Sequence, residues 1–554
     1  MDLWTKKAQI MGMLSIDTIK RLIPSSELTP EDWERKFPPR PLPAGAEVTR
    51  FAPSPTGYVH IGGILVSLIS ESVAHQSGGV FILRVEDTDR ERFVEDAVDQ
   101  LGRALEFFGI KPDEAGSTGL YGPYQQSERQ SIYDSYIFDL LKRDRAYPCF
   151  CTKDELAEMS KVQSSKGVDT GYWGEWARCR NLPEATVTQR LDAGDPYVIR
   201  FRSPEFTGKR IRYHDLIRGP LEKEDNRNDA VIRKTTGLPT YHFAHPVDDH
   251  LMRVTIMIRA DEWLSSIPLH LQLFEALGFP LPRYAHIAPL LKSDGRSKRK
   301  LSKRNDPEAA VDFYVRAGYP AEGVLVYLRG LANSRLLDGV PKEVLSAPLL
   351  LEDCSRGGQL VDIAKLDHVC REVIAEMTSD EIADRILTWA EQFDPPLAQL
   401  IREDRQAIIN ALVIHQLPPT GPRKEIAKWS DFRDKAGFLV APLFEPVTDP
   451  ADPRFAPVAA ELVSKLAKRL ADSYRHDAPP PDEWFAQIRE SGVALGFAAT
   501  AREYKNNPQL PGSIKEAANI IRVLLTGRTT SPELYPVTRT LGESEVLRRL
   551  RAVR

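Results

Sequence analysis

The sequence of 554 residues contains only five cysteines and no run of eighteen apolar residues. A sparse and odd set of thiols excludes a disulfide scaffold and fits a reducing compartment. The missing apolar run excludes a membrane-spanning helix, and residues 1–7 lack the apolar core of a signal peptide. We therefore expect a cytoplasmic protein with no membrane association.

The chain also lacks an excess of positive charge, because 74 Lys and Arg stand against 78 Asp and Glu, for a net charge of −4. This balance does not exclude RNA, since contacts with phosphates need only a local basic patch. Internal repeats and low-complexity tracts are missing as well. A chain of this length predicts about three to four domains.

The most informative segment is Arg50–Gly63, with the sequence RFAPSPTGYVHIGG. It is proline-rich, then passes a histidine and two glycines into a helical pattern that begins at Ile64. Glycines let a backbone approach a ligand, and a helix N-terminus attracts anions. The segment predicts a phosphate-binding turn, with an ordinary surface loop as the alternative. A second motif, Lys300–Arg304 (KLSKR), favours the first interpretation, because the two motifs in this order are far more specific than either alone.

Alternating strand and helix patterns predict an α/β fold with a parallel sheet, followed after about residue 340 by a mostly helical region. A serine with Glu or Gln three positions later indicates a helix start. The expected strands are 80–85, 197–201, 229–232 and 254–259, and the expected capping boxes are Ser127 with Gln130 and Ser513 with Glu516.

Taken together, these residues resemble the bacterial-type glutamyl-tRNA synthetases, a family of class I aminoacyl-tRNA synthetases. FAPSPTG at 51–57 and EWLSS at 262–266 are specific to that family. The resemblance implies a Rossmann-like catalytic domain with an inserted α+β acceptor-binding subdomain and an all-α anticodon-binding region. The expected parts are an N-terminal extension (1–47), the first catalytic half (48–146), the acceptor-stem insertion (147–236), the second catalytic half (237–340) and the helical region (341–554).

The resemblance implies ATP-dependent attachment of L-glutamate to tRNA through a glutamyl-adenylate. Such activation asks the protein for positioning and charge stabilisation rather than covalent chemistry. We predict His60, Lys300 and Lys303 as catalytic residues. The expected ATP-binding residues are His60, Gly62, Gly63, Glu262 and Lys303.

Glutamate needs cations for its carboxylates and an acid for its ammonium group. Arg50 and Arg259 are the candidates for the carboxylates, because a guanidinium matches a carboxylate with two hydrogen bonds. The resemblance assigns the ammonium group to Glu86 and adds Ala52, Ser54 and Tyr241 as substrate contacts. His245 departs from the family, where many members carry asparagine, but it can still form a hydrogen bond there.

Cys149, Cys151 and Cys179 invite a metal interpretation, since some relatives bind zinc through two early cysteines and a later Cys-x-His pair. Here Asn181 stands in place of the histidine and cannot replace it as a ligand. Three thiols without a fourth donor form an incomplete tetrahedron. We therefore expect a subdomain without zinc and no metal site, with ATP and Mg²⁺ as the cofactors.

The expected partners are L-glutamate and a glutamate tRNA, with the glutamine tRNA as a second candidate, and the expected state is a monomer. Three rival functions are a truncated relative that glutamylates a tRNA base, a glutaminyl enzyme, and an inactive paralogue that binds RNA. The long region after KLSKR argues against the first, and its helical periodicity argues against the β-rich second. The presence of His60, Lys303, Arg50 and Glu86 together argues against the third.

Overall fold

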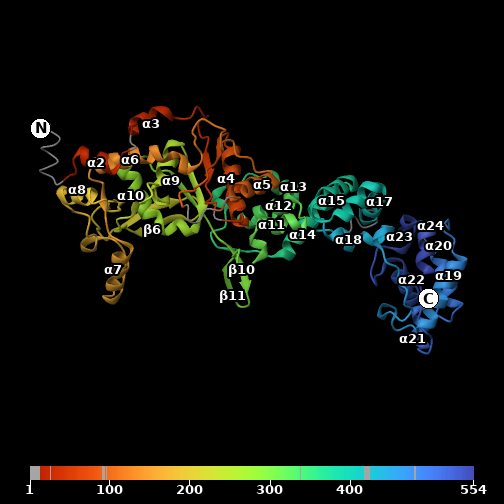
Figure 1. The fold of residues 1–554 in the computed structure, drawn as a ribbon. Helices are drawn as coiled ribbons and strands as arrows, with labels where there is room; N and C mark the ends of the chain where they lie inside the picture. Colours follow the sequence, from red (N-terminus) through yellow and green to blue (C-terminus); the bar gives the residue numbers. More distant parts are fainter. Residues whose placement is uncertain are drawn as a thin grey trace. The chain divides into compact units, whose positions relative to one another are not determined.

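The computed structural model describes residues 13–24, 27–55, 57–89, 94, 96–336, 339–416, 424–478 and 482–554. The chain forms two compact units, residues 1–313 with 325–362 and residues 314–324 with 363–554. In Figure 1 the mixed α/β elements run from red to green, and the helices of the second unit continue to blue. Among the described residues, no helix is long and apolar enough to cross a membrane.

Parallel strands build the centre of the first unit. Strand β1 (Val48–Phe51) pairs in parallel with β2 (Val80–Leu83), and helix α4 (Ile61–Gln76) connects them. Strand β8 (Ile256–Ala260) pairs in parallel with β9 (Arg283–Ile287). The Thr255 N–H donates to the Val48 carbonyl, so β1 and β8 start side by side. The predicted strands 80–85 and 254–259 are therefore confirmed.

The segment predicted as an insertion contributes to two different sheets. Its own antiparallel sheet contains β3 (Ala146–Cys149), β4 (Val198–Phe201) and β7 (Val231–Arg233), which confirms the strands expected at 197–201 and 229–232. Strand β5 (Arg210–Asp215) pairs with β6 (Gly219–Glu224) and also joins the main sheet beside β9. The end of β5 thereby reaches the strands that carry the candidate site.

The N-terminal segment packs on helix α6 (Gln130–Lys142) through α2 (Ile16–Leu22) and α3 (Pro30–Lys36). The capping box predicted at Ser127 and Gln130 is wrong, because the 3₁₀ turn η1 (Gln126–Arg129) precedes α6 and no side chain caps it. The Ser127 hydroxyl instead donates to Asp87 Oδ2 at 2.6 Å. A contact distant in sequence has replaced the local cap.

The remaining elements of the first unit connect these strands or cover the sheet. They are α5 (Ala97–Phe107), α7 (Lys153–Ser165), η2 (Gly174–Trp176), α8 (Glu184–Asp192), α9 (Tyr241–Leu251), η3 (Asp261–Ser266), α10 (Ile267–Leu277), β10 (Leu290–Asp294), β11 (Ser297–Lys300), η4 (Pro307–Ala309), η5 (Ser334–Leu336), α13 (Pro341–Ser346), η6 (Leu351–Asp353) and β12 (Gln359–Leu360). Helices α11 (Val311–Ala317) and α12 (Ala321–Ala332) contribute residues to both units.

The second unit is helical, as predicted, and has two apolar cores. The Ser513 and Glu516 capping box predicted there is confirmed at the start of α22. The helices are α14 (Ile363–Ala375), α15 (Ser379–Phe393), α16 (Pro395–Glu403), α17 (Arg405–Gln416), α18 (Asp431–Lys435), α19 (Ala460–Ser473), α20 (Asp482–Val493), α21 (Ala501–Asn506), α22 (Ile514–Thr526), α23 (Leu534–Leu541) and α24 (Glu543–Leu550), with short turns η7 (Gly437–Leu439), η8 (Ala441–Leu443) and η9 (Pro453–Phe455).

Candidate active site

A cavity of about 400 Å³ lies where β1, α4, α9 and β8 meet the β10–β11 hairpin. It is lined by residues that are far apart in the sequence and that the motifs had singled out. Two predicted residues, His245 and Lys303, are not part of this lining. The predicted residues that line the cavity are Arg50, Ala52, Ser54, His60, Gly62, Gly63, Glu86, Tyr241, Arg259, Glu262 and Lys300.

His60 is the N-cap residue of α4 and has a defined tautomer. The Gly62 N–H donates to His60 Nδ1 at 2.9 Å, so the ring hydrogen lies on Nε2, which is 3.4 Å from the Leu301 carbonyl oxygen. Burial, together with the charges of Lys303 and Lys300, lowers the pKa of His60. A neutral imidazole therefore presents an N–H donor beside a helix N-terminus, as an anion site requires.

The two glycines keep the first turn of α4 free of side chains. A Cβ at Gly62 would lie 3.0 Å from His60 Nδ1, and a Cβ at Gly63 would lie 3.3 Å from the Phe51 ring. Either side chain would press on a neighbour that lines the cavity. The glycines are therefore needed for the close packing of His60 and Phe51 around the turn.

The KLSKR loop is tied to the hairpin at its centre. Leu301 is buried, and its N–H donates to the Leu290 carbonyl at 2.9 Å. Asp306 accepts hydrogen bonds from both Nη atoms of Arg299 at 2.7 Å and from the Ser302 N–H at 2.9 Å. These contacts fix the backbone from which the two lysines extend.

Both lysines of the loop approach the first motif. The Lys303 ammonium donates to the Tyr58 carbonyl and, with His60, lines a smaller hollow of about 190 Å³. Lys300 forms an ion pair with Glu262 at 2.5 Å, in which both side chains are more than half exposed. Exposed pairs of this kind contribute little stability, so Lys300 can exchange its partner for a phosphate.

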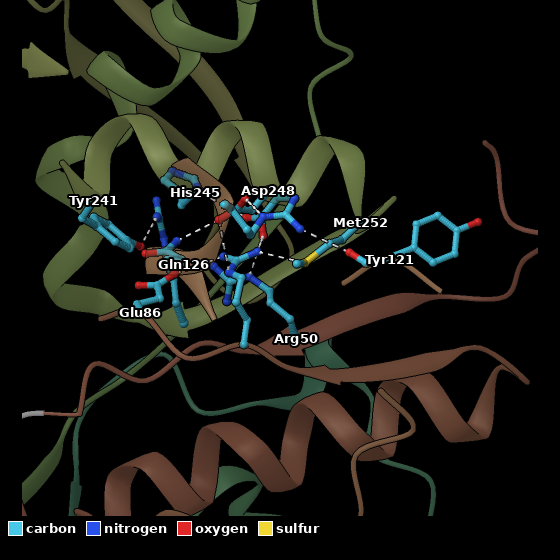
Figure 2. Close-up of polar contacts among 12 residues, drawn as sticks. Arg50, Glu86, Tyr121, Gln126, Tyr241, His245, Asp248 and Met252 are labelled. Atoms are coloured by element: carbon cyan, nitrogen blue, oxygen red, sulfur yellow. Dashed lines mark hydrogen bonds and ion pairs between the residues drawn. The ribbon is translucent and has the colours of Figure 1, made fainter. Parts of the chain in front are cut away.

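A buried cluster of charges (Figure 2) lies next to the cavity, and two of its members, Arg50 and Glu86, line it. Arg84 donates to Asp249 at 2.6 Å and to Glu86 at 3.0 Å, and Arg50 donates to Asp249 at 3.3 Å. Asp248 accepts from Arg129, Tyr133 and Gln126 at 2.6, 2.8 and 2.9 Å. The cluster joins the strands that carry Arg50 and Glu86 to helix α9.

The sequence analysis missed Arg84 and Asp249, which orient the two predicted substrate residues. The available signal was Arg84 within an otherwise apolar strand, two positions before Glu86 and thus on the same side of the strand. Asp249 lies four residues after His245, a spacing that places both on one helix face. The structure pairs them, with 3.1 Å between His245 Nδ1 and Asp249 Oδ2.

His245 lies behind Tyr241 rather than on the cavity surface. The two rings stack with centroids 5.2 Å apart, and His245 is fully buried. Burial lowers the pKa of His245 to about 3, although the hydrogen bond with Asp249 opposes the shift. In this arrangement His245 supports Tyr241, and its predicted contact with glutamate stays a prediction.

The three cysteines Cys149, Cys151 and Cys179 lie together in the inserted segment, at the end of β3 and in the turn before α8, with sulfur atoms within 4.8 Å of one another. Cys151 Sγ lies 3.6 Å from Cys179 Sγ. The Tyr172 hydroxyl lies 3.4 Å from the sulfurs of Cys149 and Cys151 and accepts from the Cys179 N–H at 2.9 Å. Asn181, in place of the family's histidine, offered no fourth donor in the sequence, and this tyrosine was not predicted beside the thiols.

Comparison with known proteins agrees with this architecture. Residues 47–366 match the model of the catalytic domain of class I tRNA synthetases (E and Q), and residues 511–554 match an anticodon-binding domain. The fold and the cavity at its strand ends are thus those of a class I aminoacyl-tRNA synthetase.

Full-length relatives narrow the assignment. The glutamate–tRNA ligase of Clostridium perfringens is 40% identical over 97% of this chain and 100% of its own length. That of Sorangium cellulosum is 39% identical over 95% and 98%. The structure of a glutamate tRNA ligase from Elizabethkingia meningosepticum, in complex with its amino acid, superimposes with a TM-score of 0.73 at 27% identity, covering 91% of this chain and 98% of that one. The chain belongs to the glutamate–tRNA ligase family.

Proposed function

We propose that the protein attaches L-glutamate to tRNA in two steps. In the first, the α-carboxylate of glutamate attacks the α-phosphorus of ATP, the bond to pyrophosphate breaks, and glutamyl-adenylate forms. In the second, a 3′-terminal ribose hydroxyl of tRNA attacks the carbonyl carbon, and AMP leaves. The observation that carries the proposal is the single cavity that both motifs and both glutamate-binding arginines line.

The phosphate side of the cavity would hold ATP as its Mg²⁺ complex. The Nε2–H of His60 and the N-terminus of α4 offer donors to phosphate oxygens, and Lys303 brings a positive charge to the same edge. Charge develops on the phosphates as pyrophosphate departs, so fixed donors at this place lower the barrier. The protein itself forms no covalent bond.

The glutamate side combines two cations with one acid. Arg50, Arg259 and Glu86 all line the cavity, and Tyr241 lies beside Arg259. Guanidinium groups suit the two carboxylates, and the Glu86 carboxylate suits the ammonium group. A dicarboxylic amino acid matches this set of charges.

An aminoacylation assay tests the proposal. Purified protein, ATP, Mg²⁺ and radiolabelled glutamate are incubated with glutamate tRNA, and acid-precipitable label is followed, with glutamine as the matched control amino acid. We expect label on tRNA with glutamate alone. Absence of glutamyl-tRNA with any tRNA would contradict the proposal.

The same assay addresses the finer predictions. We propose glutamate tRNA as the main acceptor, and a parallel reaction with glutamine tRNA measures the second candidate. We also propose a monomer, which light scattering at assay concentration checks. A cytoplasmic location stays a prediction that rests on the sparse cysteines.

The cysteine cluster suggests a separate, structural role for a metal. Zinc with bonds of about 2.3 Å to sulfur and about 2.0 Å to oxygen places its tetrahedral ligands about 3.5–3.8 Å apart. The distances of 3.4 Å from the Tyr172 hydroxyl to the sulfurs of Cys149 and Cys151, and of 3.6 Å between the sulfurs of Cys151 and Cys179, fit this geometry. Against the sequence-based expectation, we propose that these four side chains hold one Zn²⁺, which would fasten the turn after β3 to the segment around Cys179.

Metal analysis of the purified protein checks this role. We expect about one zinc per chain, lost in the Cys151→Ser, Cys179→Ser double variant. Cys370→Ser, at a buried cysteine outside the cluster, is the control and should keep its zinc. If the wild-type protein contains no zinc and a chelator does not change its melting temperature, the expectation of a subdomain without zinc holds.

A further inference from the structure

Arg259 is a buried cation that has no anionic partner among the residues that the structure describes. Its side chain donates from Nε to His286 Nε2 at 3.1 Å, from Nη2 to His270 Nδ1 at 3.3 Å, and from Nη1 to the Tyr241 hydroxyl at 3.4 Å. The residue is 4% exposed, and no carboxylate of the described residues lies within 4.0 Å of its nitrogens. The aromatic ring of Tyr284 lies 5.3 Å from its guanidinium carbon.

The other buried arginines of the site are arranged differently. Arg50 and Arg84 both contact Asp249, and Arg84 also contacts Glu86. Each of these two cations is thus compensated inside the protein. Isolated buried charges are costly, so the lack of a carboxylate at Arg259 needs a reason.

The acceptors around Arg259 are fixed as neutral imidazoles. A guanidinium only donates, so His286 Nε2 and His270 Nδ1 must both carry lone pairs. The remaining ring hydrogens then lie on His286 Nδ1, 2.6 Å from Asp215 Oδ2, and on His270 Nε2, 3.0 Å from His242 Nδ1. Burial lowers the pKa of His286 and of His270, which agrees with neutral rings.

Asp215 anchors this chain of contacts from the end of β5. It is fully buried, and its Oδ1 accepts from the N–H groups of Ile217 and Arg218 at 3.0 and 2.9 Å. Burial alone would raise the pKa of Asp215, but the hydrogen bonds from His286 and the backbone lower it overall. The carboxylate is therefore charged, and one imidazole ring separates it from Arg259.

We propose that Asp215 and His286 are positioning residues that hold Arg259 in place without neutralising it, so that a carboxylate of the substrate becomes its counterion. The proposal rests on the proposed glutamate-binding function of the cavity. The contacts run from Asp215 at the end of β5 through His286 on β9 to Arg259 on β8. The neutral ring keeps one edge of the guanidinium fixed while its charge stays available to the ligand.

The decisive variants at position 286 are Gln and Glu, which have the same shape but differ in charge. Both reach approximately to the place of Nε2, and both offer an oxygen to Arg259. His286→Gln should retain most glutamate affinity, whereas His286→Glu supplies an internal counterion. We expect the KM for glutamate to rise at least about 10-fold more in the Glu variant, with the KM for ATP within about 2-fold of wild type in both.

Asp215→Asn is the second variant, because a buried Glu at 286 next to Asp215 can impair folding. Asparagine cannot fix the tautomer of His286, so we expect a KM for glutamate raised several-fold with kcat reduced less. Melting curves of all variants accompany the kinetics. Equal KM values for the Gln and Glu variants, or for Asp215→Asn and wild type, would overturn the proposal. Wild-type protein that charges no tRNA with glutamate would instead contradict the proposed function.

Discussion

Two acids in the same buried cluster have pKa values that are shifted in opposite directions. Burial opposes ionisation of Asp249, but Arg50 and Arg84 hold its pKa well below the usual range. Burial raises the pKa of Glu86 to about 7, and the charges of Arg84 and Arg50 only partly oppose that rise. Asp249 is thus a permanent anion, whereas Glu86 titrates near neutrality.

This difference predicts the pH dependence of glutamate binding. In the proposed function an ionised Glu86 binds the ammonium group, and protonation below pH 7 removes that charge. We expect the KM for glutamate to rise as the pH falls from 8 to 6, approaching about 10-fold per pH unit. Aminoacylation at saturating ATP and tRNA measures it. Glu86→Gln should show a high KM with little pH dependence, and a flat profile for wild type would contradict the assigned role.

Residue types and motif order were enough to predict nearly half of the residues that line the cavity, from Arg50 to Lys300. They could not predict what holds those residues. Arg84, Asp215 and His286 form hydrogen bonds with residues that are distant in sequence, Arg84 with Asp249 and His286 with Asp215, and such pairings follow from tertiary packing rather than from local pattern. For the same reason Tyr172 was missed beside the three cysteines.

At the level of elements, the two predicted capping boxes had different outcomes. Ser513 caps α22 because its hydroxyl and the Glu516 carboxylate meet each other's backbone N–H groups. Ser127 has the same pattern, but its hydroxyl and its N–H both donate hydrogen bonds to Asp87. Helix α6 therefore starts at Gln130, three residues after Ser127, and no side chain caps it. A local capping pattern thus predicts that a helix follows. It does not predict the first residue of the helix where a buried acid, here Asp87, takes the hydrogen bonds of the capping serine.

The α22 cap has a measurable effect on stability. Ser513→Ala removes the acceptor of the Lys515 N–H and one partner of Glu516, and should destabilise the second unit by about 1 kcal/mol. Denaturant unfolding followed by circular dichroism measures the shift. Ser473→Ala, on an exposed serine at the end of α19, is the control and should change stability by less than about 0.5 kcal/mol.

The KLSKR loop yields a second prediction at this scale. Lys303→Ala removes the charge that we propose lies beside the phosphates, whereas Asp306→Ala releases the anchors at Arg299 and Ser302. We expect the first to lower kcat about 100-fold and the second about 10-fold. Neither should change the Kd for tRNA by more than about 2-fold, since both act on activation. Equal losses in kcat and tRNA affinity would refute the assigned role of Lys303.

For the whole molecule, the division into units predicts which fragments are stable. Residues 314–324 belong to the second unit, where Gly318 accepts from the Trp429 N–H and Tyr319 donates to Asp367. A fragment 1–362 therefore exposes this segment and should aggregate or melt lower. A fragment 1–445 retains those partners and is the control. Equal solubility and melting of the two fragments would contradict this division.

The fold class and the helical nature of the second unit could be predicted because periodicity persists over many residues. The membership of β5 in the main sheet could not be predicted in this way. Its alternating, charged sequence fits an exposed hairpin within the predicted insertion, and only the pairing of Asp215 with Tyr284 places its end in the main sheet. This pairing of β5 with β9 brings Asp215 next to the strands β9 and β8, which carry His286 and Arg259.

The order in which the chain visits its two units affects how it emerges from the ribosome. Residues 314–324 are the first part of the second unit to be synthesised. Residues 325–362, which belong to the first unit, come next, and Trp429 of the second unit is synthesised later still. At about 5–20 residues per second, the roughly one hundred residues between Gly318 and Trp429 take about 5–20 s to synthesise. Over that interval the segment gains its partners in sequence order, Asp367 for Tyr319 before Trp429 for Gly318, so the speed of translation across this stretch sets how long these contacts stay incomplete.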